Sequence, residues 1–106
     1  MAEKIPTTMT AIEITQPGGP LVLKAGKRAV PEPNIGELLI EVKAAGVNRP
    51  DVLQRQGHYP PPAGVSDIPG LEIAGDIVAV GENVTRFRVG ERVTALVAGG
   101  GYAQYC

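Results

Sequence analysis

The stretch that decides the fold is Gly46–Asp51, which reads GVNRPD and continues as VLQRQGHYP. An apolar strand pattern precedes it, and a short helix and a proline-rich loop follow. Asn48 suits a helix N-cap, Pro50 falls in the first turn where its missing N–H costs nothing, and Asp51 complements the helix dipole there. Gly57 ends the helix after about two turns. The stretch therefore predicts a strand that ends in polar side chains at the mouth of a core, where chemistry can take place.

Short apolar segments on both sides of this stretch predict a mainly β domain. In the clearest one, residues 37–47, Leu38, Ile40, Val42 and Ala44 are expected to share one face. The 14 glycines and 10 prolines indicate many turns and short strands. We therefore predict a compact, partly open β-barrel with one short helix. The other expected strands are residues 9–14, 21–24, 71–81, 91–97 and 102–106.

The remaining segments carry weaker local signals. Residues 1–8 are expected to form a flexible lead-in, and a single domain is expected over residues 9–106. Gly75 is expected to bend its strand. The turn region after that strand is expected to tuck three apolar side chains inward, namely Val84, Phe87 and Val89. The chain stops inside an apparent strand, which indicates a boundary set by truncation.

Composition excludes several classes of function. The net charge of −1, without clusters of Lys or Arg, argues against a nucleic-acid surface and a polybasic membrane patch. No segment approaches the roughly 18 apolar residues that a membrane helix needs. Cys106 is the only cysteine, so the chain can form neither an internal disulfide nor a cysteine-based zinc site alone. Without an apolar signal sequence, these features predict a cytoplasmic protein.

Several motifs occur in one order along the chain: GVNRPD at 46–51, RQGHYP at 55–60, PGLEIAG at 69–75, GERV at 90–93 and GGGYAQY at 99–105. Together they resemble the medium-chain dehydrogenase/reductase superfamily, and in particular its zinc-free quinone oxidoreductase branch. The resemblance extends from about Met9 to Cys106. It implies a GroES-like barrel, followed in the family by a Rossmann cofactor domain that these 106 residues do not contain.

The resemblance also implies an activity. The full-length enzyme would transfer hydride from NADPH to a quinone or another α,β-unsaturated carbonyl, and it would be a homodimer with a small-molecule substrate. The 106 residues alone are expected to be inactive, because the cofactor would be bound mainly by the absent domain. An enoyl reductase of the same superfamily is the alternative enzyme. A non-catalytic GroES-like binding or scaffold module is the alternative from another class.

Asn48 is the most informative position. In the zinc-dependent branch, the resemblance places a cysteine zinc ligand at the position of Asn48 and a histidine ligand at that of Leu71. Leucine cannot bind metal, and an amide is a poor zinc ligand beside thiolate or imidazole. We therefore expect no zinc. The family implies that Asn48 lies beside the nicotinamide and the substrate, where its NH₂ could donate to a developing oxyanion. The residues alone favour a helix cap, whereas the resemblance favours the active-site role, and one side chain can serve both.

Three further positions are candidates for contact with substrate. The family implies that Tyr59 lines the substrate pocket, where it is also a candidate catalytic residue, whereas its sequence context also fits a ring packed on the barrel rim. Gly100 and Gly101 belong to a run that the family places close to the active-site cleft, where small residues leave room for a flat ring. A simple hairpin is the other interpretation of that run. His58 could act as a general acid or base, but we expect a surface histidine.

The charged residues near the motif have structural interpretations. Asp51 could handle protons, but capping and charging the helix end is the favoured role. Arg49 and Arg55 could face a phosphate or a carboxylate, and solvated surface positions are expected instead. If Glu72 were buried it would need a partner, for which Arg92 is the candidate.

Overall fold

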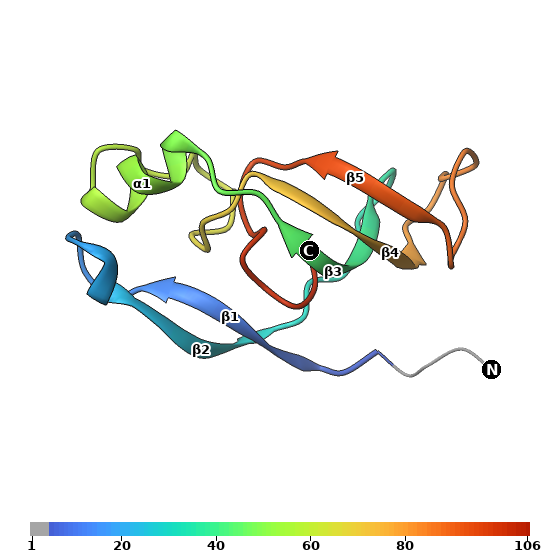
Figure 1. Cartoon of the computed structure of the whole chain (residues 1–106). Coiled ribbons are helices and arrows are strands. Elements are labelled where there is room, and N and C mark those ends of the chain that lie inside the picture. The colour runs from blue at the N-terminus through green and yellow to red at the C-terminus, as the bar shows by residue number, and fades with distance from the viewer. Residues whose placement is uncertain (1–4) are drawn as a thin grey trace.

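Two antiparallel sheets and one α-helix make up the described part of the chain, residues 5–106 of a computed structural model (Figure 1). The first sheet has two strands and the second has three, with β4 in the middle. The helix connects the first strand of the second sheet to its middle strand. The elements are β1 (Thr8–Ile14), the 3₁₀ turn η1 (Pro20–Val22), β2 (Leu23–Ala29), β3 (Leu38–Ala45), α1 (Arg49–Gln56), β4 (Glu72–Val80) and β5 (Arg92–Leu96).

The C-terminal residues 102–106 join the two sheets. Ala103 forms an antiparallel bridge to Ala11 of β1, and Tyr105 forms one to Glu41 of β3. In Figure 1 this red segment lies between β1 and β3. The expected strand at 102–106 is therefore wrong in detail, because two isolated bridges replace a continuous ladder. Within the described residues, β2 and β5 each pair with one strand only, which confirms the mainly β, partly open barrel.

Irregular pairing in β3 alters the expected alternation of its side chains. The register against β4 shifts between Leu39 and Ile40 and again between Val42 and Ala44. As a result, the consecutive residues Leu39 and Ile40 are both buried, whereas Ala44 is exposed. The expectation that Ala44 shares the buried face is therefore wrong. Gly75 of β4 lies opposite this irregular region, where an added Cβ would be 2.1 Å from the Glu41 carbonyl oxygen.

The second strand differs from the sequence expectation. Instead of a strand at 21–24, residues Pro20–Val22 form η1, and β2 continues to Ala29. The sequence KAGKRA has no apolar run, so its strand is imposed by the pairing with β1 rather than by propensity. Thr8 is already part of β1, and residues 1–4 of the expected lead-in lie outside the described residues.

The buried core consists of two clusters. Met9, Ala11 and Ile68 form the first, against the two-stranded sheet, and the second lies on the three-stranded sheet. Phe87 and Val89 belong to neither, since 43% and 55% of their surface is exposed. The expectation that they pack inward is wrong, because the loop between β4 and β5 extends beyond the sheets (Figure 1). The second cluster is formed by Ile40, Ile73 and Ile77.

Candidate functional site

The start of α1 is built as the sequence predicts. Asn48 is the N-cap and has extended backbone angles, and Asp51 is the fourth residue of a capping box. The Asn48 backbone N–H donates to Asp51 Oδ2 at 3.0 Å, and the Asp51 N–H donates to the Asn48 carbonyl, also at 3.0 Å. Gly57 ends the helix in the left-handed region, at φ 87°, which suits glycine. This arrangement fixes the backbone from which the Asn48 side chain projects.

Asp51 does more than cap the helix. It is the one described polar or charged residue that is buried, with 5% of its surface exposed. Besides Asn48, its carboxylate accepts from the Gly70 N–H at 3.2 Å and from the Tyr102 hydroxyl at 2.8 Å. A buried carboxylate is stable only when such donors compensate for lost water. Asp51 therefore ties together three segments: the end of β3, the approach to β4 and the glycine-rich turn at 99–101.

Tyr102 lies at the inner side of this cluster. Its hydroxyl donates to Asp51 and also lies 3.2 Å from the Gly46 carbonyl oxygen. Burial raises the pKa of the Tyr102 phenol well above its usual value, and the hydrogen bond to the Asp51 carboxylate raises it further. The phenol therefore stays protonated and acts as a hydrogen-bond donor. Local sequence carries no signal for this contact, because 51 residues separate the two partners.

The Asn48 side chain points toward Glu72, the first residue of β4. Its Nδ2 lies 3.3 Å from Glu72 Oε1, which assigns the donor end of the amide to the carboxylate side. An added Cβ at Gly46 would lie 2.1 Å from the same Glu72 oxygen, so glycine at position 46 leaves the room that Glu72 occupies. Glu72 is exposed. The expected burial of Glu72 against Arg92 is wrong, because Asn48 is its hydrogen-bonding partner.

Gly70 and Gly101 pack backbone against backbone beneath this cluster. The Gly101 N–H donates to the Gly70 carbonyl at 3.0 Å, and an added Cβ at Gly70 would lie 2.6 Å from the Tyr102 nitrogen. Gly70 also has φ 108°, a conformation that side chains disfavour. The glycine-rich turn is thus held against the start of β4, and this contact brings Tyr102 to Asp51.

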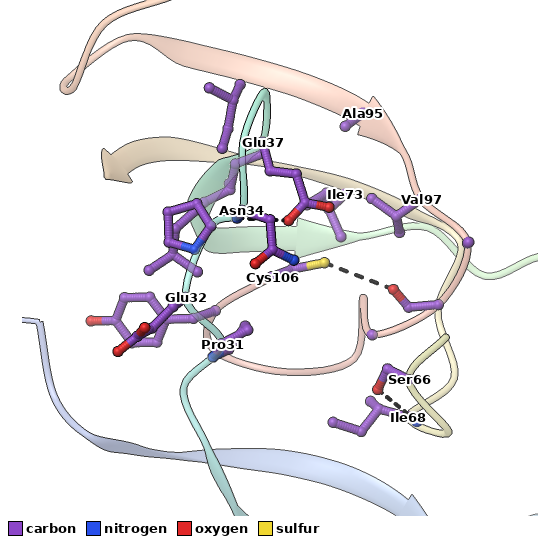
Figure 2. Close-up of a pocket in the computed structure, with 18 of the residues that line it drawn as sticks. Pro31, Glu32, Asn34, Glu37, Ser66, Ile68, Ile73, Ala95, Val97 and Cys106 are labelled. Carbon is purple, nitrogen blue, oxygen red and sulfur yellow. Dashed lines mark hydrogen bonds between the residues drawn. The ribbon is translucent and has the colours of Figure 1, made fainter. Parts of the chain in front are cut away.

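A cavity of about 780 Å³ lies between the sheets (Figure 2). Gly100 lines it, together with apolar side chains such as Ile73 and Val97 and the thiol of Cys106. Burial raises the pKa of that thiol. Asn48 and Tyr59 are not among the lining residues. The candidate residues from the sequence therefore fall into two places, with Gly100 at the cavity and Asn48 at the polar cluster.

The remaining candidates lie on the surface or near it. Tyr59 has 39% of its surface exposed, and His58 and Arg49 are exposed as well. Arg55 is only half-buried, and its Nε donates to the Gly18 carbonyl at 3.1 Å. The expectation of a solvated Arg55 is therefore wrong, because this side chain fastens α1 to the loop between β1 and β2.

No group of three or more His, Cys, Asp or Glu side chains in residues 5–106 could hold a metal ion. None of the helices found in the same range has the length and apolar character to cross a membrane.

Residues 34–106 match the alcohol dehydrogenase GroES-like domain. The chain belongs to this domain family. It is 46% identical to the quinone oxidoreductase of Lama guanicoe over 99 residues, and that alignment covers 92% of the chain and 30% of the relative. Human quinone oxidoreductase is 41% identical, also over 99 residues that cover 92% of the chain and 30% of the relative. A mouse synaptic vesicle membrane protein VAT-1 homolog-like is 39% identical over 89 residues, covering 84% of the chain and 21% of the relative. The chain thus spans less than a third of these curated relatives.

Solved structures give the same family. The human VAT-1 homolog-like protein superposes with a TM-score of 0.84 at 37% identity, over 93% of this chain and 32% of that protein. The quinone oxidoreductase from Coxiella burnetii gives 0.81 at 27% identity, over 92% and 33%. A mycobacterial protein solved in complex with NADPH gives 0.79 at 42% identity, over 92% and 30%. The resemblance to the quinone oxidoreductase branch and the GroES-like fold are therefore confirmed.

Proposed function

We propose that this chain is the substrate-side domain of an NADPH-dependent quinone oxidoreductase, which reduces quinones or other α,β-unsaturated carbonyls. The relatives named above support this assignment. The observation that carries it for these residues is the Asn48 amide, which is held at the start of α1 with its Nδ2 3.3 Å from Glu72 Oε1. It places a fixed hydrogen-bond donor where the zinc-dependent branch is expected to place a metal ligand.

The proposed role of Asn48 follows from its donor capacity. An amide NH₂ has two hydrogens, and one directed to Glu72 leaves the other for a substrate oxygen. When a conjugated carbonyl accepts a hydride, negative charge develops on that oxygen, and a preorganised donor lowers the barrier by stabilising it. The capping geometry and the contact with Glu72 supply the preorganisation. Asn48 is thus both the helix cap and the proposed catalytic donor.

The described residues do not fit a complete NADPH site. A dinucleotide pyrophosphate is commonly bound at a glycine-rich helix N-terminus, but the first turn of α1 holds the carboxylate of Asp51, which would repel phosphate. We therefore propose that NADPH is bound mainly by a part of the full-length protein outside these residues, with Asn48 facing the nicotinamide. NADPH supplies the hydride when bound.

Zinc independence belongs to the same proposal. It is supported by the chemistry of Asn48 and Leu71, which replace the two ligands expected in the zinc-dependent branch. Tyr59, Gly100 and Gly101 are proposed to contact the substrate. Gly100 lines the cavity between the sheets, where its small size leaves room for a flat ring, and Gly101 follows it directly in the same turn. Tyr59 is proposed to approach the same substrate from the loop after α1.

The full-length protein is proposed to be a cytoplasmic homodimer without nucleic-acid or membrane partners. The net charge of −1 argues against a nucleic-acid surface and a polybasic membrane patch. The alternative enzyme, an enoyl reductase, would differ from a quinone oxidoreductase in the substrate that accepts the hydride. A non-catalytic module would show no turnover with either acceptor. The relatives named as quinone oxidoreductases favour the quinone acceptor.

The test is an assay of the full-length protein with NADPH and 1,4-benzoquinone, after metal removal. We expect oxidation of NADPH that depends on the quinone and persists without zinc. A second arm replaces the quinone with an enoyl thioester. Faster turnover of the thioester would favour the enoyl reductase, and no turnover with any acceptor would favour a non-catalytic module.

A further inference from the structure

The loop that carries Tyr59 is fastened at both ends. At its start, the His58 N–H donates to the Leu53 carbonyl of α1 at 2.8 Å. At its end, the Asp67 carbonyl accepts from Gln54 Nε2 of the same helix at 2.9 Å. The segment between these two anchors, residues 59–66, is called the Tyr59 loop below. Its ends are therefore set by α1.

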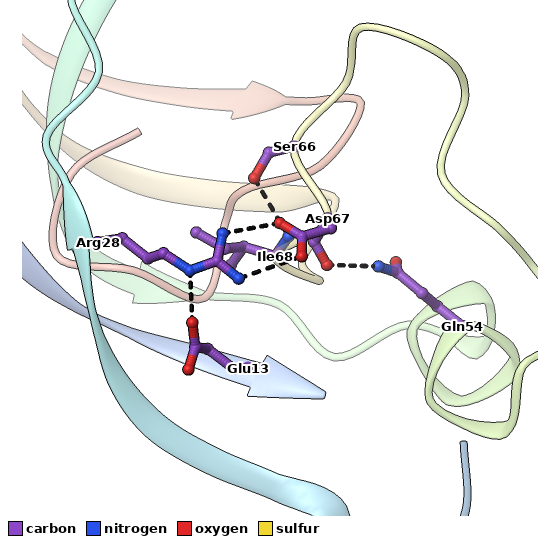
Figure 3. A network of polar contacts seen from close by, with 6 residues as sticks. All are labelled: Glu13, Arg28, Gln54, Ser66, Asp67 and Ile68. Carbon is purple, nitrogen blue, oxygen red and sulfur yellow. Dashed lines mark hydrogen bonds and ion pairs between the residues drawn. The ribbon is translucent and has the colours of Figure 1, made fainter. Parts of the chain in front are cut away.

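A second set of contacts fastens the same end to the first sheet (Figure 3). Arg28 of β2 binds the Asp67 carboxylate with both terminal nitrogens, Nη1 to Oδ1 at 2.8 Å and Nη2 to Oδ2 at 3.1 Å. Its Nε donates to Glu13 of β1. Two-point pairing fixes the orientation as well as the distance of the carboxylate. The hydrogen bonds to Asp67 and Glu13 raise the pKa of Arg28 further above its already high value.

The proline content of the loop links its anchored end to Tyr59. Pro60, Pro61 and Pro62 follow the tyrosine directly, and a proline run is stiff because each ring fixes its own φ angle. The Val65 N–H then closes a turn on the Pro62 carbonyl at 3.1 Å. The proline run and this turn leave residues 63–66 as the flexible part between Tyr59 and Asp67, so the position of Asp67 is linked to that of Tyr59.

The loop and its anchor also border the cavity between the sheets. Gly64, Ser66 and Arg28 all line it, and Ser66 is seen beside the cavity in Figure 2. The Ser66 hydroxyl accepts from the Ile68 N–H at 3.1 Å, and Ile68 is part of the buried core. The wall of the cavity therefore depends on the same anchor.

We propose that Arg28 and Asp67 are positioning residues that hold the Tyr59 loop in the arrangement required to bind substrate. The inference rests on the proposed substrate contact of Tyr59. The Asp67 side chain is 67% exposed and that of Arg28 is 32% exposed. Exposed pairs contribute little to global stability. Their loss should loosen the loop while leaving the fold intact.

The test uses the full-length enzyme and the variants Asp67→Asn and Arg28→Gln. We expect the KM for 1,4-benzoquinone to rise about two- to fivefold, the range of an exposed ion pair, with kcat unchanged. The KM for NADPH should not change. Asp67→Glu keeps the carboxylate and should restore part of the affinity. Lys43→Gln removes another exposed ion pair, with Glu41, and serves as the control with normal kinetics.

Hydrogen exchange separates this inference from the proposed function. Amides in the Tyr59 loop should exchange faster in Asp67→Asn than in the parent enzyme, with β3 and β4 unchanged. Unchanged exchange in the loop, or faster exchange throughout the domain, would overturn the positioning role. The loop could loosen as expected while neither Asp67→Asn nor Tyr59→Ala changes the KM for quinone. In that case the role of Arg28 and Asp67 in holding the loop stands, and the proposed substrate contact of Tyr59 is refuted.

Discussion

The Asn48 amide nitrogen lies 3.3 Å from Glu72 Oε1, across the gap between the start of α1 and the start of β4. The contact joins the end of one strand to the start of its neighbour, since β3 and β4 are paired. It orients the donor end of the amide. The proposed catalytic function of Asn48 can be separated by mutation from its function as a helix cap.

Asn48→Ser is the variant that separates the two roles. Serine remains a good N-cap, but its hydroxyl is too short to reach where the amide reaches. If the amide donates to the oxyanion, kcat should fall by ~10²–10³ with little change in stability, because that charge exists mainly in the transition state. Asn48→Ala should lower stability by ~1 kcal/mol as well. Steady-state kinetics and thermal melts of the full-length enzyme measure both effects, and an unchanged kcat in Asn48→Ser would reject the catalytic role.

Asp51→Asn should destabilise the domain. The amide cannot accept from all three donors, and its own NH₂ must face at least one of them. A donor left buried without a partner costs about 1–3 kcal/mol. Urea unfolding followed by circular dichroism measures the change in the free energy of unfolding. Asp76→Asn on β4 is the matched control, for which a change within about 0.5 kcal/mol is expected. Equal effects of the two variants would contradict the assigned role of Asp51.

Tyr102→Phe should alter stability at alkaline pH. Burial and the Asp51 carboxylate raise the pKa of the folded phenol above its unfolded value of about 10. Below that pH both states keep the proton and the stabilisation is complete. Above it the unfolded chain releases the proton first, so stability falls as pH rises. Melts between about pH 9 and 11 should show a smaller loss in Tyr102→Phe than in the parent chain. Parallel losses would mean that Tyr102 does not contribute.

The 106-residue chain is expected to bind no stoichiometric zinc. Asn48 and Leu71 offer neither thiolate nor imidazole, and Cys106 lies instead against the cavity. Metal analysis of protein purified without chelators measures the content directly. One tightly held zinc per chain would contradict the zinc-free assignment, and Cys106→Ser would then report whether the thiol is a ligand.

The 106-residue chain alone is also expected to bind NADPH weakly and to show no reductase activity. The N-terminus of α1 holds the Asp51 carboxylate, which disfavours a pyrophosphate there. Calorimetric titration with NADPH at millimolar concentration should give no binding heat. Micromolar affinity would place the cofactor site within these residues, and the full-length protein titrated in parallel shows that the nucleotide preparation is competent.

Much of the architecture could be predicted from local sequence. Contacts within a few residues determine three features: the strand at residues 38–45, the helix start at Asn48 and the helix end at Gly57. The family resemblance followed from ordered motifs of the same kind. Errors arose where pairing overrides propensity, as in the polar β2, and where a bulge shifts the side chains of β3. They also arose at Phe87 and Val89, whose apolar side chains are not covered by another part of the fold.

Only the tertiary structure decided how the candidate site is assembled. The contact of Asp51 with Tyr102 spans 51 positions, that of Asn48 with Glu72 spans 24, and that of Arg28 with Asp67 spans 39. Such pairs have no signal in local sequence, because each depends on how the strands and the glycine-rich turn pack. The sequence alone determined which side chains can donate, accept or carry charge. Packing determined which of them meet, since a buried carboxylate requires donors wherever the fold can supply them.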